Sequence, residues 1–384
     1  MVEVGKFTLE SLTTGMYSDP RIVYREYIQN SVDSIENAVA EGLMSNEDAY
    51  IKVFIDAENG CISIIDNGKG ISVARATNVL LSIGKSTKRQ DANRGFRGIG
   101  RLGGLSYCEH LSFTTSVQGE DVATRIVFDC KLLKSLLSPD HEEELDLQSV
   151  IERITEVEEI DVDKDDHFFR VDMDEVDSSS ELLDLDEIKQ YLSEVAPVPY
   201  DERHFVVAPE IKRFLTEHDY TLTEFKIFIG YDEDHLKQVR KPNRYRFRSD
   251  RNQRTEDVIT EVVTFSIDLD STSSLLGWYG RCNWNGTLSD NALLGMRMRL
   301  GNILIGDRRT MDVMFKEPRF NGWVQGEIFV NTTGLIPNAR RDDFEQNEVY
   351  YQMIEKLKAR VGDVITREIR EASKTRNNPD ARLL

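Results

Sequence analysis

Apolar residues recur near helical spacing between Leu9 and Gly42, apart from a short turn that ends at Pro20, a residue suited to the start of a helix. We therefore predict a largely helical N-terminal stretch. Two strand-like runs follow, Ile51–Ile55 and Cys61–Ile65, and an Asn-Gly turn joins them. This arrangement predicts a β-hairpin that ends in a glycine-rich turn.

The pattern continues as further helical and strand-like segments. In the first half we predict a helix at 73–82, strands at 110–116, 124–129 and 167–173, and a helix at 185–195. In the second half we predict strands at 225–230, 258–268, 276–283, 295–304 and 323–331, and a closing helix from Glu348 to about Ala372. Residues 138–166 are heavily acidic and predict a solvated helix and loop inserted between strands.

Composition limits the class of protein. The 384 residues suggest two to three domains, and 48 Lys and Arg against 68 Asp and Glu give a formal net charge of −20. The chain shows neither an apolar run of membrane-helix length nor a signal-peptide core, so we expect a cytoplasmic protein without a membrane partner. Four widely separated cysteines fit a reducing compartment and argue against a zinc site. The acidity disfavours wholesale wrapping by nucleic acid, although a local basic stripe can exist.

Three short segments carry candidate chemistry, and the first lies in the N-terminal helical stretch. Glu26, Asn30 and Asp33 are spaced i, i+4, i+7 and share one helical face. A carboxylate there can orient a water molecule, and the Asn amide oxygen can ligate a hard cation such as Mg²⁺. The competing interpretation is an ordinary polar face of a helix.

The second segment, residues 64–70, is a strand that runs into a turn with two glycines, Gly68 and Gly70. The Asp66 carboxylate at the strand end can accept a hydrogen bond from an exocyclic amine, and the glycines allow the backbone close to a flat base. The competing interpretation is an Asx turn.

The third segment, residues 95–104, is a glycine cluster that opens a predicted helix, so its free backbone N–H groups can cradle phosphate. It matches the dinucleotide pattern G-x-G-x-x-G, but no strand precedes it in a βαβ unit. Gly84-Lys85-Ser86 does not complete a P-loop, because Val79 stands where the first glycine is needed. We exclude both interpretations.

In order and spacing, the three segments resemble the motifs of the Bergerat-fold ATPases, the GHKL superfamily of gyrase, heat-shock protein 90, histidine kinases and MutL-type proteins. The matching patterns are E-x-x-x-N-x-x-D, D-x-G-x-G and G-x-x-G-x-G. Residues 14–38 look like the first helices of heat-shock protein 90, whereas GKSTKR and GFRGIGRLGG look closer to the microrchidia (MORC) and MutL branches.

The resemblance implies an α+β fold with two domains and a tail. A Bergerat ATP-binding α/β sandwich would occupy residues 1–197, an S5-like α/β transducer domain 198–345, and a C-terminal helix and polar tail 346–384. The acidic insertion near 138–166 lies outside the common pattern. The implied ligands are ATP and Mg²⁺.

The resemblance also implies a role for each matching residue. Glu26 would be the general base, Asn30 the Mg²⁺ ligand, and Asp66 the acceptor of the adenine amine, with Gly70 making room for the base. The rest of the implied nucleotide site comprises Asp33, Gly68, Lys85, Ser86, Lys88, Gly95, Phe96, Arg97, Gly98, Ile99 and Gly100.

The resemblance extends more weakly into the second domain. GLIPNARRDDF resembles the transducer loop that sends a basic residue to the γ-phosphate, so Arg341 or its neighbour Arg340 would be this basic finger. The competing interpretation pairs the two arginines with Asp342 and Asp343.

One departure from the family concerns the adenine site. Family members usually carry a Gly-Thr near the last strand of the ATPase domain, where the hydroxyl supports the adenine-binding carboxylate. Here the comparable strand reads Asp166-His167-Phe168-Phe169, which leaves the support of Asp66 unassigned.

The implied activity is Mg²⁺-dependent ATP hydrolysis coupled to ATP-driven dimerisation of the N-terminal domains, which would make the protein a homodimeric clamp. One hypothesis for its client is DNA, with genome defence as one option, since residues 237–254 interleave basic and aromatic side chains. The alternative is a heat-shock protein 90-like chaperone ATPase acting on protein clients, which fits the first helices and the net acidity.

Overall fold

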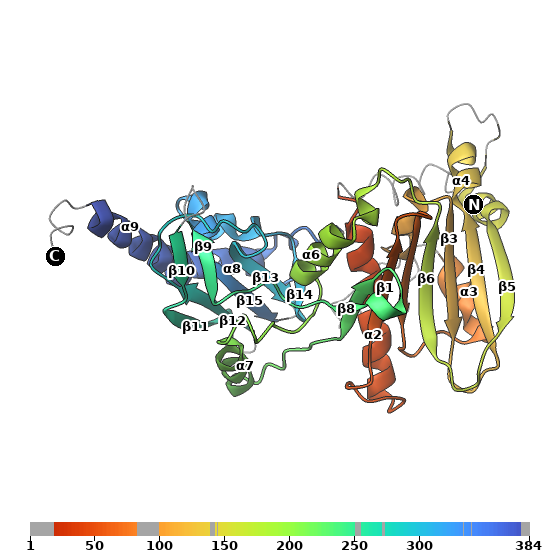
Figure 1. The fold of residues 1–384 in the computed structure, drawn as a ribbon, viewed down its shortest axis with the longest axis horizontal. Helices are drawn as coiled ribbons and strands as arrows, with labels where there is room; N and C mark the ends of the chain where they lie inside the picture. The colour runs from red at the N-terminus through yellow and green to blue at the C-terminus, as the bar shows by residue number, and fades with distance from the viewer. Residues whose placement is uncertain are drawn as a thin grey trace. The chain divides into compact units, whose positions relative to one another are not determined.

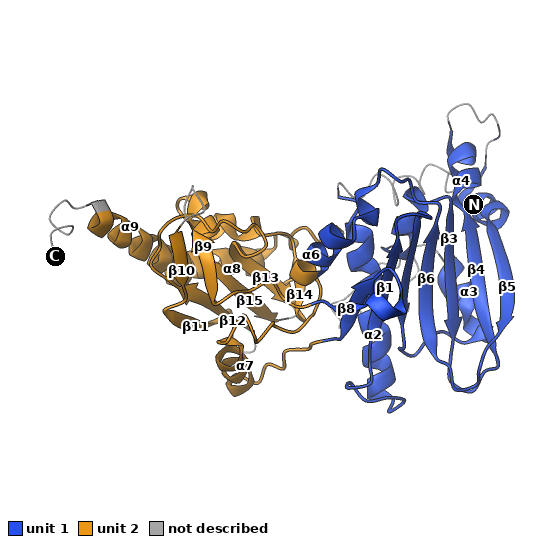
Figure 2. Ribbon diagram, in the orientation of Figure 1, with its two compact units in different colours: residues 1–192, 225–239 blue, residues 193–224, 240–384 orange. Residues whose placement is uncertain are grey.

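The computed structural model describes residues 19–82, 100–138, 143, 145–249, 255–270, 273–332, 334–338 and 340–377. The chain divides into two compact units, residues 1–192 with 225–239, and residues 193–224 with 240–384 (Figure 2). The chain thus leaves the first unit, returns to it for one short segment and leaves it again. Within the described ranges no helix is long and apolar enough to cross a membrane, and the cytoplasmic location stays a prediction.

The first unit is built on an eight-stranded sheet with the order β5-β4-β3-β6-β2-β1-β7-β8 (Figure 1). Its strands are β1 (Ile51–Asp56), β2 (Cys61–Asp66), β3 (His110–Ser116), β4 (Val122–Asp129), β5 (Thr155–Asp161), β6 (Phe168–Asp174), β7 (Ile227–Gly230) and β8 (Lys237–Gln238). Its helices include α2 (Ile22–Ala40), α3 (Val73–Leu81), α4 (Cys130–Leu137), α5 (Leu147–Ile154) and most of α6 (Leu185–Val195), with a short 3-10 segment, η2 (Gly100–Ser106). The predicted α+β class is confirmed.

Alternating burial along the central strands gives this sheet one covered face. In β1, Ile51, Val53 and Ile55 are buried, while the residues that alternate with them are half-buried. The antiparallel register places these three opposite Asp66, Ile64 and Ile62 of β2, so the same face of both strands enters the core. Helix α2 packs on β2 and α3 on β4, so helices and sheet bury their apolar faces against one another. The predicted hairpin is confirmed.

The helix α4 was not predicted, and two strands of the first unit differ from the prediction. The predicted strand at 225–230 belongs to this sheet and not to the second domain, because β7 pairs in parallel with β1 and its buried Ile227 and Ile229 extend the covered face. The acidic insertion also contributes a strand. Its residues 155–161 form β5 at the sheet edge, where the backbone pairs with β4 while most side chains stay in solvent.

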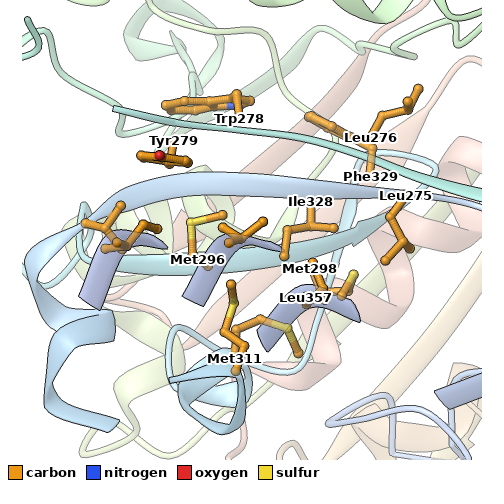
Figure 3. Packing of buried hydrophobic residues seen from close by; sticks show 14 of the residues in the cluster. Leu275, Leu276, Trp278, Tyr279, Met296, Met298, Met311, Ile328, Phe329 and Leu357 are labelled. Carbon is orange, nitrogen blue, oxygen red and sulfur yellow. The ribbon is translucent and has the colours of Figure 1, made fainter. Parts of the chain in front are cut away.

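The second unit contains a five-stranded sheet with the order β11-β12-β15-β13-β14 and a separate two-stranded sheet, β10-β9. The strands are β9 (Arg246–Ser249), β10 (Thr255–Val258), β11 (Glu261–Asp268), β12 (Ser274–Arg281), β13 (Gly295–Leu300), β14 (Ile303–Ile305) and β15 (Gln325–Asn331). The helices are α7 (Ala208–Glu217), α8 (Glu348–Leu357) and α9 (Asp363–Asn377), with a π-helical turn, η7 (Lys358–Gly362), between the last two. Met296 and Met298 of β13 gather with Met311 and Leu357 in the core of this unit (Figure 3).

The helix α7 and the strands β9 and β10 were not predicted, and two predicted elements of the second unit take a different form. The single strand predicted at 295–304 is a hairpin, because Gly301 and Asn302 adopt left-handed φ values of 54° and 65° and reverse the chain. The closing helix is confirmed, but a π-helical turn interrupts it at Gly362, whose Cα packs too closely on the Met314 carbonyl to admit a side chain. The identity of this unit as a transducer domain stays a prediction.

Candidate functional site

Helix α2 carries the predicted polar face, and its packing sets how deep each side chain lies. Glu26 is buried, with 7% of its surface exposed, whereas Asn30 and Asp33 are half-buried. Oε1 of Glu26 lies 4.0 Å from Nη2 of the buried Arg25. Glu26 therefore does not lie on a solvent-exposed face of the helix.

The 3-10 segment η2 lies against the same end of α2. A Cβ added at Gly100 would overlap Oε2 of Glu26 and lie 3.1 Å from its Cδ. The Tyr27 hydroxyl donates to the Arg101 carbonyl at 3.0 Å and accepts from the Gly104 N–H at 3.1 Å. Glycine at position 100 thus brings the backbone to the carboxylate with no side chain between them.

Asp66 ends β2 on the covered face of the sheet. Ile62, Ile64 and Asp66 are the buried positions of this strand, so its period of two directs the carboxylate toward the core. Burial raises the pKa of Asp66 to about 7, because an ionised carboxylate loses its hydration there. The Ser31 hydroxyl, the Gly68 N–H and the Ser34 hydroxyl act in the opposite direction and lower that pKa.

The two oxygens of this carboxylate have different surroundings. Oδ1 accepts the Gly68 N–H at 2.9 Å, which is the geometry of an Asx turn. Oδ2 is buried and accepts no hydrogen bond from the described residues; the Ser31 and Ser34 hydroxyls lie close enough to affect the pKa but not in hydrogen-bonding geometry with it. Leaving a buried oxygen unsatisfied costs about 1–3 kcal/mol. When Asp66 is ionised, Oδ2 is therefore suited to a donor on a ligand, such as an exocyclic amine.

The turn after Asp66 needs glycine for steric reasons of its own. Gly70 has φ of +67°, and a Cβ there would overlap the Ser116 carbonyl oxygen and lie 2.9 Å from that of Phe168. A Cβ at Gly68 would overlap the Ser34 hydroxyl. Backbone packing accounts for both glycines, and the role of Gly70 in admitting a base stays a prediction.

Hydroxyl and imidazole groups brace this turn where the family's Gly-Thr is missing. Thr115 in β3 accepts the Ile71 N–H at 2.8 Å and donates to the Phe168 carbonyl at 3.0 Å. Nδ1 of His167 lies 2.8 Å from the Gly68 carbonyl oxygen. Neither Thr115 nor His167 was among the predicted site residues.

Several predicted phosphate neighbours fall outside the described residues. They are Lys85, Ser86, Lys88, Gly95, Phe96, Arg97, Gly98 and Ile99. Their part in the site stays a prediction.

The predicted arginine finger belongs to the second unit. Arg341 has a left-handed φ of 55°, and its carbonyl accepts the Gly306 N–H at 2.9 Å, so backbone contacts fix this loop. Asp342 accepts a hydrogen bond from the Asn338 side chain at 2.6 Å. The role of Arg340 or Arg341 as the finger stays a prediction.

The residues brought together in the first unit form an elongated polar strip along α2. Glu26, Asn30 and Ser34 follow at intervals of four residues, a span of about 12 Å along the helix axis. Glu26 lies against Gly100 at one end, and Ser34 lies beside the Asp66 turn at the other. The half-buried Asn30 between them offers an amide oxygen of the kind that binds Mg²⁺ together with substrate phosphates. The strip suits an elongated ligand with an amine at one end and a reactive group at the other.

The raised pKa of Asp66 predicts a pH-dependent stability of the ligand-free protein. The folded state holds the Asp66 proton up to about pH 7, while the unfolded chain releases it near pH 4. Stability is therefore lost as pH rises from about 4 to 7, by about 1.4 kcal/mol for each unit of pKa shift. Asp66→Asn removes this contribution, so its thermal midpoint relative to wild type is expected to rise between pH 5 and pH 8. Asp56→Asn, at the other end of the same hairpin, is the matched control and should show no such rise.

Comparison with known proteins identifies a family that is similar to the N-terminal part of this chain. Residues 17–162 match the family described as histidine kinase-, DNA gyrase B-, and HSP90-like ATPase, a range that contains Glu26, Asp66 and Gly100. The match covers 146 of the 384 residues, and it supports a GHKL-type ATP-binding region at the N-terminus. The predicted recognition of the Bergerat-fold superfamily is thereby confirmed for this part of the chain.

The similar proteins include bacterial chaperones. Chaperone protein HtpG of Acinetobacter baylyi is 36% identical over 84 residues, 20% of this chain and 13% of its own length. HtpG of Clostridium botulinum is 31% identical over 110 residues, 26% of this chain and 18% of its own length. HtpG of Nitrosomonas europaea is 30% identical over 129 residues, 29% of this chain and 20% of its own length. The chain thus spans a fifth or less of the length of these relatives, and each match covers less than a third of this chain.

Proposed function

We propose that the ATPase domain binds Mg²⁺–ATP and hydrolyses it. The observation that carries this proposal is the Asp66 carboxylate, which is fully buried, with one oxygen satisfied by the turn and one without a donor. The exocyclic amine of adenine supplies such a donor, whereas guanine carries a carbonyl at the equivalent position. The site should therefore prefer ATP to GTP.

Glu26 is the proposed general base. It would accept a proton from the attacking water, and it lies against Gly100, the last glycine of the pattern predicted to hold phosphate. Asn30 would hold Mg²⁺, which when bound neutralises charge on the phosphate oxygens. Asp33, Gly68 and the phosphate neighbours outside the described residues would complete the site.

The test of this proposal is phosphate release from ATP by the purified chain. We expect steady turnover with Mg²⁺ and none after the Mg²⁺ is chelated with EDTA, and we expect GTP to be a poorer substrate. Turnover that persists in EDTA, or equal use of ATP and GTP, would contradict the proposed site.

For the second unit we propose the role of a transducer domain. Arg341 or Arg340 would reach the γ-phosphate and neutralise charge on it, while ATP binding would close a homodimer of N-terminal domains. The observation in favour is the backbone anchoring of the Arg341 loop through Gly306, which gives the arginines a fixed base. Arg341→Ala should lower turnover without changing the affinity of the ATPase domain for adenosine.

An exposed pair of arginines on β9 favours the hypothesis that the protein acts as a clamp on DNA. Arg246 and Arg248 alternate outward along β9, where both are exposed while Phe247 between them is buried. Arginines in a row on a strand can contact successive phosphates. If they do, Arg246→Glu with Arg248→Glu should weaken binding to duplex DNA and lower the dependence of log K on log salt concentration by about 2.

A chaperone ATPase is the alternative, and similarity to the HtpG chaperones favours it. Measurements of DNA binding and of chaperone activity on the same protein distinguish the two hypotheses. Salt-dependent DNA binding that requires Arg246 and Arg248 supports the clamp, whereas ATP-dependent suppression of the aggregation of an unfolded model protein, without DNA binding, supports the chaperone.

A further inference from the structure

Arg101 joins two elements that flank the segment 83–99. Its Nε donates to the Leu80 carbonyl at 3.1 Å, and its Nη2 donates to the Ser82 carbonyl. Helix α3 ends at Leu81, so these carbonyls belong to the set that a helix leaves without internal partners at its C-terminus. A guanidinium there satisfies them and complements the negative end of the helix dipole.

The backbone of Arg101 is tied to a third element. Its carbonyl accepts the Tyr27 hydroxyl at 3.0 Å, and the same hydroxyl accepts the Gly104 N–H at 3.1 Å. Tyr27 is 2% exposed and immediately follows Glu26 in α2. One buried hydroxyl therefore fixes η2 against the turn of α2 that carries Glu26.

The preceding residue contacts the proposed base directly. The Gly100 backbone lies so close to Glu26 that an added Cβ would overlap the carboxylate. The position of Gly100 thus depends on the neighbouring Arg101, which is held by α3 through its side chain and by α2 through its carbonyl.

We infer that Arg101 is a positioning residue for the proposed hydrolysis: it couples the end of α3 to η2 and so sets the distance between the Gly100 backbone and Glu26. The inference rests on the proposed function, and it concerns a side chain that donates hydrogen bonds to the Leu80 and Ser82 carbonyls at the end of α3. A general base must lie within hydrogen-bonding reach of the water, and an error of about 1 Å in such a geometry can cost 100-fold in rate. Burial lowers the pKa of the Arg101 guanidinium, but arginine remains charged in proteins.

The position of Arg101 also predicts which kinetic constant it affects. It acts at the Glu26 end of α2, whereas the Asp66 turn lies about 12 Å along the helix axis. Loss of the side chain should therefore lower kcat, while the affinity for adenosine, which has no phosphates, should stay the same.

The experiment compares four variants with wild type in kcat for ATP and in the Kd of adenosine. Arg101→Met keeps an apolar stem but loses both bonds to α3, and we expect kcat to fall by at least tenfold with the Kd of adenosine within about twofold. Arg101→Lys keeps the charge and can reach one carbonyl, so it should recover part of the rate. Tyr27→Phe breaks the link to α2 and should also lower kcat; it keeps the test open if Arg101→Met fails to fold. Lys134→Met is the matched control, because Lys134 donates to the Cys108 carbonyl just beyond η2 and its loss should leave kcat unchanged.

A second measurement does not depend on ATP turnover. The Gly104 N–H that bonds to Tyr27 should exchange with solvent at least tenfold faster in Arg101→Met than in wild type, as followed by amide hydrogen exchange. An unchanged kcat in both Arg101→Met and Tyr27→Phe, or an unchanged exchange rate at Gly104, would overturn the inference. If wild type hydrolyses no ATP, the proposed function fails on that result, and the exchange rate at Gly104 alone decides whether Arg101 positions η2.

Discussion

Replacing Glu327 with alanine is expected to lower the free energy of unfolding of the second unit by about 3–5 kcal/mol, the usual result of removing one partner from a buried ion pair. Glu327 lies in β15 with 1% of its side chain exposed. Its Oε1 accepts hydrogen bonds from Nζ of Lys241, at 3.0 Å, and from Nε of Arg299. Both cationic side chains are 0% exposed. Its Oε2 accepts the Tyr200 hydroxyl and the Trp278 indole N–H, the latter at 3.3 Å.

The charges in this network explain the size of the effect. Burial alone disfavours an ionised Glu327, but Arg299 and then Lys241 outweigh it and lower its pKa to about 2. Burial lowers the pKa of Lys241 to about 7, and repulsion from Arg299 acts in the same direction. Without Glu327, two buried cationic groups would face each other with no carboxylate between them.

Urea or thermal unfolding measures this effect, and Glu261→Ala provides the control. Glu261 pairs with Arg281, but its side chain is 56% exposed, so this substitution should change stability by no more than about 1 kcal/mol. A Glu327→Ala protein as stable as Glu261→Ala would mean that the buried network contributes nothing to the second unit.

Replacing Glu26 with glutamine is expected to lower ATP turnover by roughly 100- to 10,000-fold, the range that a lost general base produces. Glutamine keeps the shape of the side chain against Gly100 but cannot accept the proton of the attacking water. ATP binding should persist, since the proposed acceptor of the adenine amine is Asp66 and not Glu26. The measurement is steady-state phosphate release together with equilibrium binding of ATP.

Glu36→Gln is the matched control for this prediction. Glu36 lies in the same helix ten residues further on and is half-buried, so its replacement tests the effect of removing a charge from α2. Turnover in Glu26→Gln equal to that in Glu36→Gln would remove Glu26 from the mechanism.

Local pattern predicts the parts of the site that depend on a single element. The i, i+4, i+7 spacing placed Glu26, Asn30 and Asp33 on one face of α2, and the hairpin followed from its Asn-Gly turn. The burial of Asp66 could also have been inferred, because Ile62, Ile64 and Asp66 alternate along one strand face.

Contacts between distant segments could not be predicted from the sequence. Arg101 bonds to carbonyls 19 and 21 residues away, and Lys241 pairs with Glu327 across 86 residues. Neither pair has a local pattern, because a single arginine or lysine in a sequence does not show which backbone or carboxylate will face it. The prediction that β7 belongs to the second domain is wrong for the same reason. An apolar run indicates that a strand is buried, but it does not show which strand it pairs with.

Calorimetric titration of ATP into wild type, Asp66→Asn and Asp56→Asn tests whether Asp66 recognises the nucleotide. We expect wild type and Asp56→Asn to bind ATP alike and in preference to GTP. We expect Asp66→Asn to bind ATP roughly 10- to 100-fold more weakly, because an amide whose oxygen accepts the Gly68 N–H presents N–H donors to the adenine amine, and a buried polar group left unsatisfied costs about 1–3 kcal/mol. Wild type that binds no nucleotide, or Asp66→Asn that binds ATP as tightly as wild type, would show that Asp66 does not recognise the nucleotide.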